Sequence, residues 1–371
     1  MEFDHENPAF SQTRPAWMLP TPERTDEPPA KGLRGRLRRL MQGQNLTRKA
    51  ARELLNELLD GEATDTQIAA ALVALAVKGE TVEELAGMAE AMRAHSTKIK
   101  SAHTEFIDTA GTGSSRAKTF NVSTAAAFVI AGADLPVAKH GSRAATSKSG
   151  SADVLTALGV NVSVAPEISE KCLNEIGICF LFAPLYHRST ARVAAVRREL
   201  GVHTTFNLLG PLTNPAGAPF QIIGVWHEAL IKPVAETLAA LGAQRAFVVH
   251  GADGLDEITA CDRSFVGEVE AGAVRFFEVS PEDFGCEKIA NEEMNSIRGG
   301  LPEDNAKIIS EVLNNERTDA ARVLVLMNAA AALYVGGKAA DLKTAARLAA
   351  ESLDTGAAAA KLQSLIEMTN A

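Results

Sequence analysis

From Glu105 onward the chain alternates short apolar runs with longer helix-like runs, and this alternation constrains the fold more than any other feature. The candidate strands are Phe106–Thr109, Pro136–Ala138, Val160–Val164, Ile178–Phe182, Gln221–Val225 and Ala246–His250. The candidate helices are Ser123–Gly132, Ser151–Leu158, Ile168–Ile176, Thr190–Leu200 and Leu230–Leu241. Strands that alternate with helices predict a mostly parallel central sheet flanked by helices.

Residues 46–94 have helical periodicity throughout and predict three consecutive helices with short links. For the first helix, Thr47 is the expected N-cap and Gly61 the terminator. Capping-box patterns at residues 64–67 and 81–84 mark the starts of the next two helices. Because the first helix is strongly apolar on one side, we expect it to bury that face against a second subunit.

The composition excludes several classes of protein. Of 371 residues, 46% are apolar and 22% are charged, and the formal net charge of -9 argues against nucleic acid as a partner. No apolar run reaches membrane-spanning length, and the four cysteines lack metal-binding spacing, so we expect no membrane partner and a cytoplasmic location. Residues 1–32 are rich in proline and acidic side chains, which predicts a disordered N-terminal tail.

Two glycine-rich loops, Gly111–Ser115 and Lys139–Ser147, each follow a candidate strand and precede a helix-like run. Backbone N–H groups at a turn into a helix form an anion-binding site. The second loop adds the cationic side chains of Lys139 and Arg143, and residues 121–124 supply small polar groups between the loops. Together these features predict a small-molecule ligand with more than one phosphate.

Taken alone, the first loop favours an ordinary tight turn. It is not a dinucleotide-binding fingerprint, because Arg116 stands where the third glycine would fall. It is not a Walker A loop either, because no Gly-Lys-Ser/Thr follows at the required spacing. The phosphate interpretation therefore depends on the polar residues that follow within the same strand–helix–strand pattern.

Asp256 and Glu257 follow the candidate strand Ala246–His250, at the sheet edge where α/β proteins bind ligands. Adjacent carboxylates suit Mg²⁺, which typically bridges to substrate phosphates. A solvated acidic loop is the alternative, and the flanking glycines favour the metal. Arg197 and Arg198 are consistent with either a carboxylate-binding site or a solvated helix surface.

In order and in combination, these motifs resemble the anthranilate phosphoribosyltransferase family. The resemblance covers about residues 33–371 and rests on Gly111–Gly113, Asn121–Thr124, Lys139–Arg143, Ser149–Asp153, Arg197–Gly201, Phe206–Pro215 and Asp253–Glu257. It implies an α/β protein with a small helical domain (residues 33–100 and about 186–215). The larger α/β phosphoribosyl-binding domain would comprise residues 101–185 and 216–371. It also implies a homodimer through the helical domain.

The resemblance implies transfer of a 5-phosphoribosyl group from phosphoribosyl pyrophosphate (PRPP) to anthranilate, with Mg²⁺ as cofactor, in tryptophan biosynthesis. The implied catalytic residues are Lys139, His140 and Arg197. PRPP would bind at Gly111, Ser114, Ser115, Thr119, Asn121, Val122, Ser123, Thr124, Lys139, Ser147 and Ser151. Anthranilate would contact Gly111, His140, Ser142, His187, Arg197 and Pro211. The implied metal ligands are Ser123, Asp256 and Glu257.

Two positions depart from the family pattern. Ser114-Ser115 replace a Gly-Asp pair, which changes the charge expected beside the metal. Ser142 replaces an asparagine that contacts anthranilate, so acceptor affinity or acceptor choice is expected to change. A paralogue that uses another aromatic amine is therefore an alternative, and a non-catalytic nucleic-acid-binding relative is a second one that the net charge disfavours.

Overall fold

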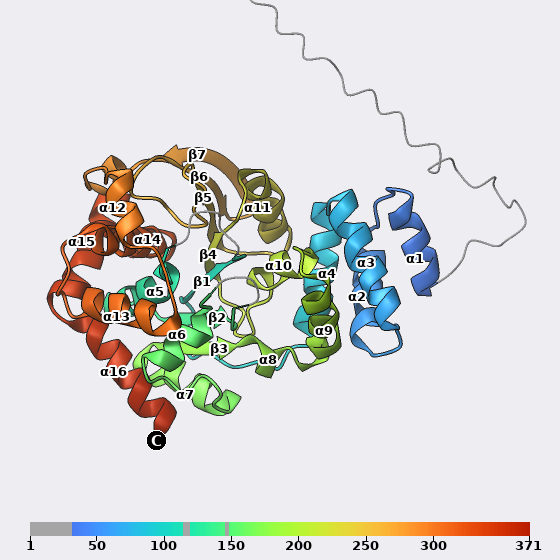
Figure 1. The fold of residues 1–371 in the computed structure, drawn as a ribbon, viewed down its shortest axis with the longest axis horizontal. Helices are drawn as coiled ribbons and strands as arrows, with labels where there is room; N and C mark the ends of the chain where they lie inside the picture. The colour runs from blue at the N-terminus through green and yellow to red at the C-terminus, as the bar shows by residue number, and fades with distance from the viewer. Residues whose placement is uncertain (1–31, 114–118, 145–147) are drawn as a thin grey trace, which may run out of the picture.

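A seven-stranded sheet runs through the larger part of the molecule, which a computed structural model describes at residues 32–113, 119–144 and 148–371 (Figure 1). The strand order is β3-β2-β1-β4-β5-β6-β7, and all pairs from β3 to β5 are parallel. The last two strands are antiparallel. The strands are β1 Ile107–Gly111, β2 Val137–Gly141, β3 Ile178–Phe182, β4 Phe220–Gly224, β5 Arg245–Gly251, β6 Ser264–Glu270 and β7 Ala273–Val279.

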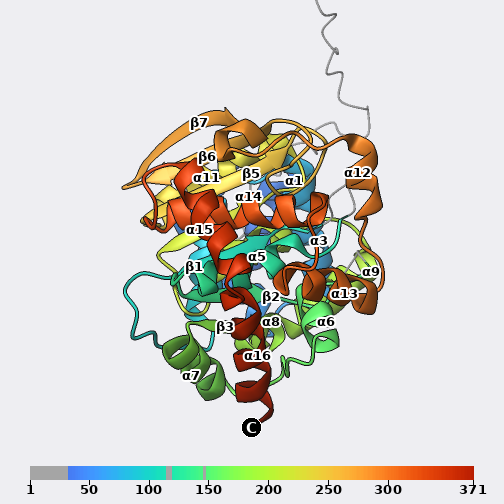
Figure 2. The same ribbon diagram turned by 90° about the vertical axis from the view of Figure 1, so that its left-hand side faces the viewer.

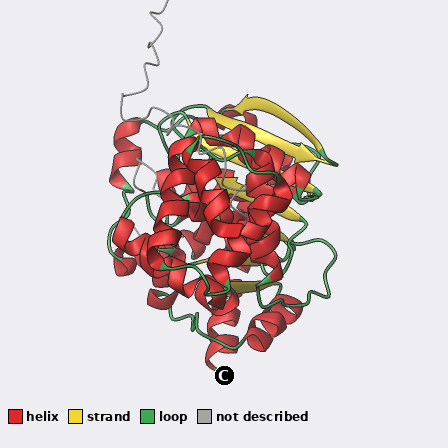
Figure 3. Cartoon of the chain, turned by 90° about the vertical axis from the view of Figure 1, so that its right-hand side faces the viewer, coloured by secondary structure: helices red, strands yellow, loops and turns green. Residues whose placement is uncertain are grey.

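The predicted fold class is confirmed, with one strand wrong and two strands missed. Residues 160–164 form no strand. Val160 and Val162 are buried in the core, but the N–H of Asn161 donates to Thr369 Oγ1 in the C-terminal helix at 3.2 Å instead of to a neighbouring strand. Strands β6 and β7 were not predicted. They form a hairpin that extends beyond the helices (Figure 3).

The helices fall into an N-terminal group and a group that flanks the sheet. The N-terminal group is α1 Gly32–Met41, α2 Arg48–Leu59, α3 Asp65–Lys78 and α4 Val82–Ala94. The others are α5 Val122–Gly132, α6 Ser151–Ala157, α7 Pro166–Ile176, α8 Ala183–Tyr186, α9 Ala191–Leu200, α10 Thr205–Leu209, α11 Ile231–Ala240, α12 Asn291–Ser296, α13 Pro302–Leu313, α14 Ala320–Val335, α15 Leu342–Asp354 and α16 Ala357–Asn370. The 3₁₀ turns are Arg188–Thr190, Pro211–Thr213, Glu228–Leu230 and Pro281–Phe284.

The predicted helix starts are confirmed. The Thr47 side chain accepts from the Ala50 N–H, and the pairs at 64–67 and 81–84 form reciprocal capping boxes. A capping box satisfies two backbone donors that the first helical turn leaves free. Helix α2 ends at Leu59, and Gly61 follows with a φ of 86°.

The expectation that the apolar face of α2 is buried against a second subunit is wrong. Its leucines at 54, 55 and 58 are buried within the chain, where α2 packs on α4. The large apolar side chains that α1 and α3 expose are instead Met41, Val73 and Val77.

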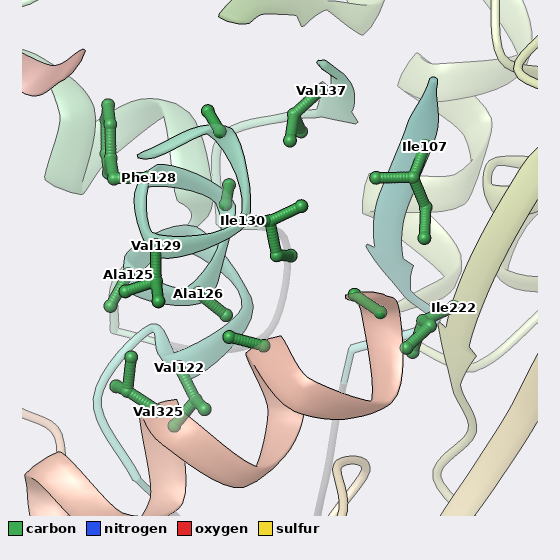
Figure 4. Close-up of a cluster of buried hydrophobic side chains, with 14 of the residues drawn as sticks. Ile107, Val122, Ala125, Ala126, Phe128, Val129, Ile130, Val137, Ile222 and Val325 are labelled. Carbon is green, nitrogen blue, oxygen red and sulfur yellow. The ribbon is translucent and has the colours of Figure 1, made fainter. Parts of the chain in front are cut away.

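The sheet separates two apolar clusters, because successive strand residues point to opposite faces. Ile222 belongs to the cluster under α5, α14, α15 and α16, which lie in front of the sheet in Figure 2. Figure 4 shows α5, α14, β1 and β4 contributing to this cluster. Ile223 belongs to the other cluster, which continues through α11 into α2, α3 and α4. The N-terminal helices therefore share an apolar core with the sheet.

Helices α9 and α10 join the N-terminal group although they lie more than one hundred residues further along the chain. Helix α9 packs on α3, and α10 packs on α4 (Figure 1). The connection from β3 to β4 thus runs over the N-terminal helices and returns to the sheet. None of the described helices is long and apolar enough to cross a membrane.

Candidate active site between the helices and the sheet

A cleft of about 490 Å³ lies between the carboxyl edge of the sheet and helices α4, α8, α9 and α10. It is lined by most of the residues that the sequence nominates: Gly111, Thr119, Asn121, Val122, Ser123, Thr124, Lys139, His140, Ser142, Ser151, His187, Arg197, Pro211, Asp256 and Glu257. Ser114, Ser115 and Ser147 lie outside the described residues.

The sheet topology explains why the cleft forms there. From β1 the chain passes to β2 on one side, whereas β4 lies on the other side of β1 and leads to β5. At such a switch point the connections diverge and leave a crevice outside the carboxyl ends of the strands. Loops that are distant in sequence therefore meet at this edge.

The first glycine-rich loop is anchored on β4. The N–H of Thr112 donates to the Gly224 carbonyl at 2.9 Å, and its hydroxyl donates to the same oxygen at 3.1 Å. The Thr112 hydroxyl also accepts from the N–H of Trp226 at 3.2 Å. Gly113 then has a φ of 68°, which few residues other than glycine adopt readily. The predicted strand-to-loop junction is present.

Gly224 allows the acidic loop to cross the end of β4. A Cβ atom at this position would lie 1.7 Å from the carbonyl oxygen of Asp256. At Gly111, a Cβ would lie 3.8 Å from Asp256 Oδ2. The absence of a side chain at Gly224 therefore brings the Asp256 carboxylate beside the first glycine-rich loop.

Lys139 and Glu257 meet at the start of α5. Lys139 is only 4% exposed, and its Nζ donates to the Thr109 carbonyl and to the hydroxyls of Thr109 and Ser123. The N–H of Ser123 donates to Glu257 Oε1 at 3.2 Å. Burial, together with the charge of Asp256, raises the pKa of Glu257 to about 8. Burial also lowers the pKa of Lys139, which the charges of Asp108 and Glu257 oppose.

This donor set fits Mg²⁺. Ser123, Asp256 and Glu257 offer hard oxygen ligands, and a divalent cation would offset the repulsion between the two adjacent carboxylates. The described residues contain no group of three or more His, Cys, Asp or Glu side chains arranged around a metal position. Mg²⁺ commonly takes its remaining ligands from water and phosphate.

The other end of the cleft has a half-buried cation. Arg197 on α9 donates from Nη2 to Asn207 Oδ1 at 3.2 Å, and its guanidinium lies 5.5 Å from the centre of the Phe206 ring. Burial lowers its pKa. Among the described residues no carboxylate forms an ion pair with it, whereas Arg198 beside it points to solvent. This guanidinium is positioned to receive an anionic group from a ligand.

Two neutral histidines line the wall between these ends. His140 is 7% exposed, and its ring lies 5.1 Å from that of His187. Burial lowers the pKa of His140 to about 3 and that of His187 to about 4. His140 Nδ1 lies 3.1 Å from the Gly210 carbonyl, so it carries the proton and donates, and Nε2 is buried without a protein partner among the described residues.

The chain matches two family models, one for the helical bundle domain (residues 36–96) and one for the a/b domain (residues 103–359) of a glycosyl transferase family. The anthranilate phosphoribosyltransferase of Desulfosudis oleivorans is 48% identical over 333 residues, which cover 90% of this chain and 97% of that protein. The Methanobrevibacter smithii enzyme of the same name is 46% identical, with 90% and 98% covered. The chain belongs to the anthranilate phosphoribosyltransferase family.

Solved structures of anthranilate phosphoribosyltransferases agree with this family membership. The Thermus thermophilus enzyme superposes with a TM-score of 0.85 at 38% identity, covering 90% of this chain and 99% of that one. The Saccharomyces cerevisiae enzyme, solved in complex with PRPP and Mg, has a TM-score of 0.82 at 28% identity, with 91% and 98% covered. Both values indicate the same fold over nearly the whole described chain.

Against this family background, several residues that the motif analysis missed shape the cleft. Asn305 on α13 donates from Nδ2 to Asn121 Oδ1 at 3.0 Å, and a Cβ at Gly299 would lie 2.2 Å from the Thr119 carbonyl. Asp108 and Asn214 are buried beside His140, which lines the cleft. Because these contacts join residues far apart in sequence, no local pattern could reveal them.

The remaining histidines have other surroundings. The ring of His203 packs against that of Trp226 in a tilted arrangement, with ring centres 4.6 Å apart. His250 Nδ1 donates to the Val225 carbonyl at 2.7 Å. Neither lines the cleft. Arg143 does line it, but its guanidinium pairs with Asp153 at 2.9 Å, which fixes the start of the second loop.

Proposed function

We propose that this chain is an anthranilate phosphoribosyltransferase. It transfers the 5-phosphoribosyl group of PRPP to anthranilate and releases N-(5-phosphoribosyl)anthranilate and pyrophosphate, a step of tryptophan biosynthesis. One observation carries the proposal: a single cleft holds a paired-carboxylate end with Lys139 and, opposite, the half-buried guanidinium of Arg197. The yeast relative, solved with PRPP and Mg and with 4-fluoroanthranilate, supports both ligand classes.

The donor end is formed by the two loops and the start of α5. We assign PRPP binding to Gly111, Ser114, Ser115, Thr119, Asn121, Val122, Ser123, Thr124, Lys139, Ser147 and Ser151. Mg²⁺, held by Ser123, Asp256 and Glu257, would supply positive charge to the departing pyrophosphate. The ammonium of Lys139, which donates to the Ser123 hydroxyl, lies in the same region. Fixed donors aimed at developing charge are a major source of catalysis.

The acceptor end orients anthranilate. Arg197 pairs with the carboxylate, and His140 accepts an N–H of the amine at its buried Nε2. Gly111, Ser142, His187 and Pro211 line the same space. The amine of anthranilate is neutral near pH 7, so alignment with the anomeric carbon contributes more than proton abstraction.

The loss of anthranilate fluorescence in the presence of PRPP and Mg²⁺ tests this assignment with purified protein. If Ser142 merely weakens one hydrogen bond, Ser142→Asn should lower the anthranilate KM by roughly 2- to 13-fold. PRPP consumption with a different aromatic amine, and not with anthranilate, would identify a paralogue. No consumption with any aromatic amine would contradict catalysis and favour a binding protein.

We also propose the domain and assembly organisation that the family implies. The helical domain would comprise residues 33–100 and about 186–215, and the packing of α9 on α3 and of α10 on α4 supports this division. A homodimer would form through this domain, supported by exposed Met41, Val73 and Val77. All four cysteines are free, as suits the cytoplasm. The predicted disordered tail, residues 1–32, falls almost entirely outside the described residues.

A further inference from the structure

Strands β1 and β2 are paired only where they begin. Their register is the single pair Ile107–Val137, whereas β2 pairs with β3, and β1 with β4, to the end of each strand. Beyond that pair, the carbonyl of Ala138 and the N–H of His140 need partners, because buried backbone groups are almost always hydrogen-bonded. Side chains provide them.

Asp108 and Asn214 fill the opening. Asp108 Oδ1 accepts from the N–H of His140 at 3.0 Å, and Oδ2 accepts from Asn214 Nδ2 at 2.8 Å. The same amide nitrogen donates to the Ala138 carbonyl at 2.8 Å. Asp108 is 0% exposed and Asn214 is 4% exposed. The two side chains therefore replace the missing ladder bonds and tie β1 to β2.

Asn214 also ends the segment 210–214, which we call the strap. The strap lines the acceptor end of the cleft with Gly210 and Pro211. From β4, Gln221 Nε2 donates to the Pro211 carbonyl at 2.9 Å. From α4, Arg93 Nε donates to the Leu212 carbonyl at 2.9 Å. The strap is thus held at several points, and Asp108 is its only carboxylate anchor among the described residues.

The same network determines the form in which His140 faces the acceptor. Asp108 accepts a hydrogen bond from the backbone N–H of His140, and the Gly210 carbonyl in the strap accepts one from Nδ1–H of the ring. The remaining nitrogen, Nε2, must then be an acceptor. If the strap moved away from His140, the ring would lose the Gly210 carbonyl and would be free to take the other tautomer, which presents a donor to the amine.

We propose that Asp108 is a positioning residue for the acceptor: through Asn214 and the His140 N–H it sets both the strap and the tautomer of His140. Asp108 does not itself line the cleft. The inference deepens the proposed function and rests on it for the identity of the acceptor. A purely structural role for this buried carboxylate is the competing explanation, and the experiment distinguishes the two.

The kinetic test compares two variants with a remote control. Asp108→Asn places two amides against each other, and Asn214→Ser breaks the link while retaining the carboxyl group of Asp108. Both should raise the anthranilate KM by about 5- to 30-fold, equivalent to one lost buried hydrogen bond, and Asn214→Ser should leave the PRPP KM within about twofold. Ser352→Ala removes an equally buried bond, to the Val129 carbonyl at 2.8 Å, outside the cleft and should change neither KM.

A second readout needs no substrate. Nitrogen NMR of the His140 ring, assigned with His140→Gln, should show the Nδ1–H tautomer in the wild type and in Ser352→Ala. A tautomer mixture is expected in Asp108→Asn and Asn214→Ser. If one variant fails to fold, the other decides. The proposal would be overturned if the variants kept the wild-type tautomer and either left both KM values unchanged or raised the KM for anthranilate and for PRPP equally. Failure of the wild type to use anthranilate would refute the proposed function alone, and the tautomer would still test the positioning role.

Discussion

The guanidinium of Arg197 provides the most direct test of acceptor recognition. Charge-assisted pairs of this kind contribute about 1.5–3 kcal/mol. Arg197→Ala should therefore raise the anthranilate KM by roughly 10- to 150-fold and leave the PRPP KM nearly unchanged. The matched control is Arg198→Ala, which removes an exposed neighbour on the same helix. Equal effects of the two variants, or an equal loss for both substrates, would contradict this role.

The buried histidines predict acid sensitivity of the fold. A histidine with a pKa near 6.5 when unfolded and about 3 when folded, as at His140, stays neutral in the native state. Below pH 6.5 the unfolded chain therefore binds more protons than the native state does. The contribution of His140 to the free energy of unfolding is fully present above pH 6.5 and is lost as the pH falls toward 3. The loss is about 1.4 kcal/mol per pH unit. Urea unfolding from pH 7 to pH 4 should show a shallower decline for His140→Gln than for the wild type, and parallel declines would contradict the assignment.

At the scale of elements, the sequence predicts best what neighbouring residues decide. The capping boxes at 64–67 and 81–84 and the strand Ile178–Phe182 were correct because caps and apolar runs are local. The strand predicted at residues 160–164 was wrong because a hydrogen bond to α16 replaced the strand pairing that their β-branched side chains suggested. The β6–β7 hairpin was missed because it lies outside the strand–helix alternation. Its turn, Ala271–Gly272, has two positive φ values but begins with alanine, whereas Asn, Asp or Gly usually marks such a turn in a sequence.

The candidate site follows the same division. Loop residues such as Lys139 and Asp256 could be nominated because their motifs are contiguous. Asp108 and Asn305 could not, and Asn214 was included only as part of the motif Phe206–Pro215 without a role, because each acts through a partner about thirty or more residues away. Predicting them requires the sheet order, which no single segment encodes.

The crossing of the acidic loop over β4 gives a prediction for these two elements. In Gly224→Ala the new Cβ would overlap the Asp256 carbonyl, so residues 253–257 must shift. The Mg²⁺ concentration needed for half-maximal PRPP binding, measured by calorimetry, should rise at least about tenfold. Gly87→Ala is the matched control, since its Cβ would lie 2.1 Å from the Arg48 carbonyl among the N-terminal helices. It should lower stability and leave Mg²⁺ dependence unchanged, and the opposite ordering would contradict the prediction.

For the whole molecule, the exposed apolar side chains of α1 and α3 predict the site of association. Val77 is 81% exposed and Met41 is 76% exposed. If a homodimer forms there, Val77→Asp should convert it to monomers in analytical ultracentrifugation, because a charge in an apolar interface is costly. Phe276→Asp, on the exposed face of β7, is the control and should remain dimeric. A dimer that survives Val77→Asp but dissociates in Phe276→Asp would place the interface on the hairpin.

The opening between β1 and β2 also has a consequence for how this chain can evolve. Changing Asp108 or Asn214 alone leaves a buried polar group unpaired, at a cost of about 1–3 kcal/mol from a total stability of about 5–15 kcal/mol. A change at both positions must pass through a single variant that is less stable by this amount. The two positions are therefore inherited as a unit, and descendants of this sequence should retain both or replace both together.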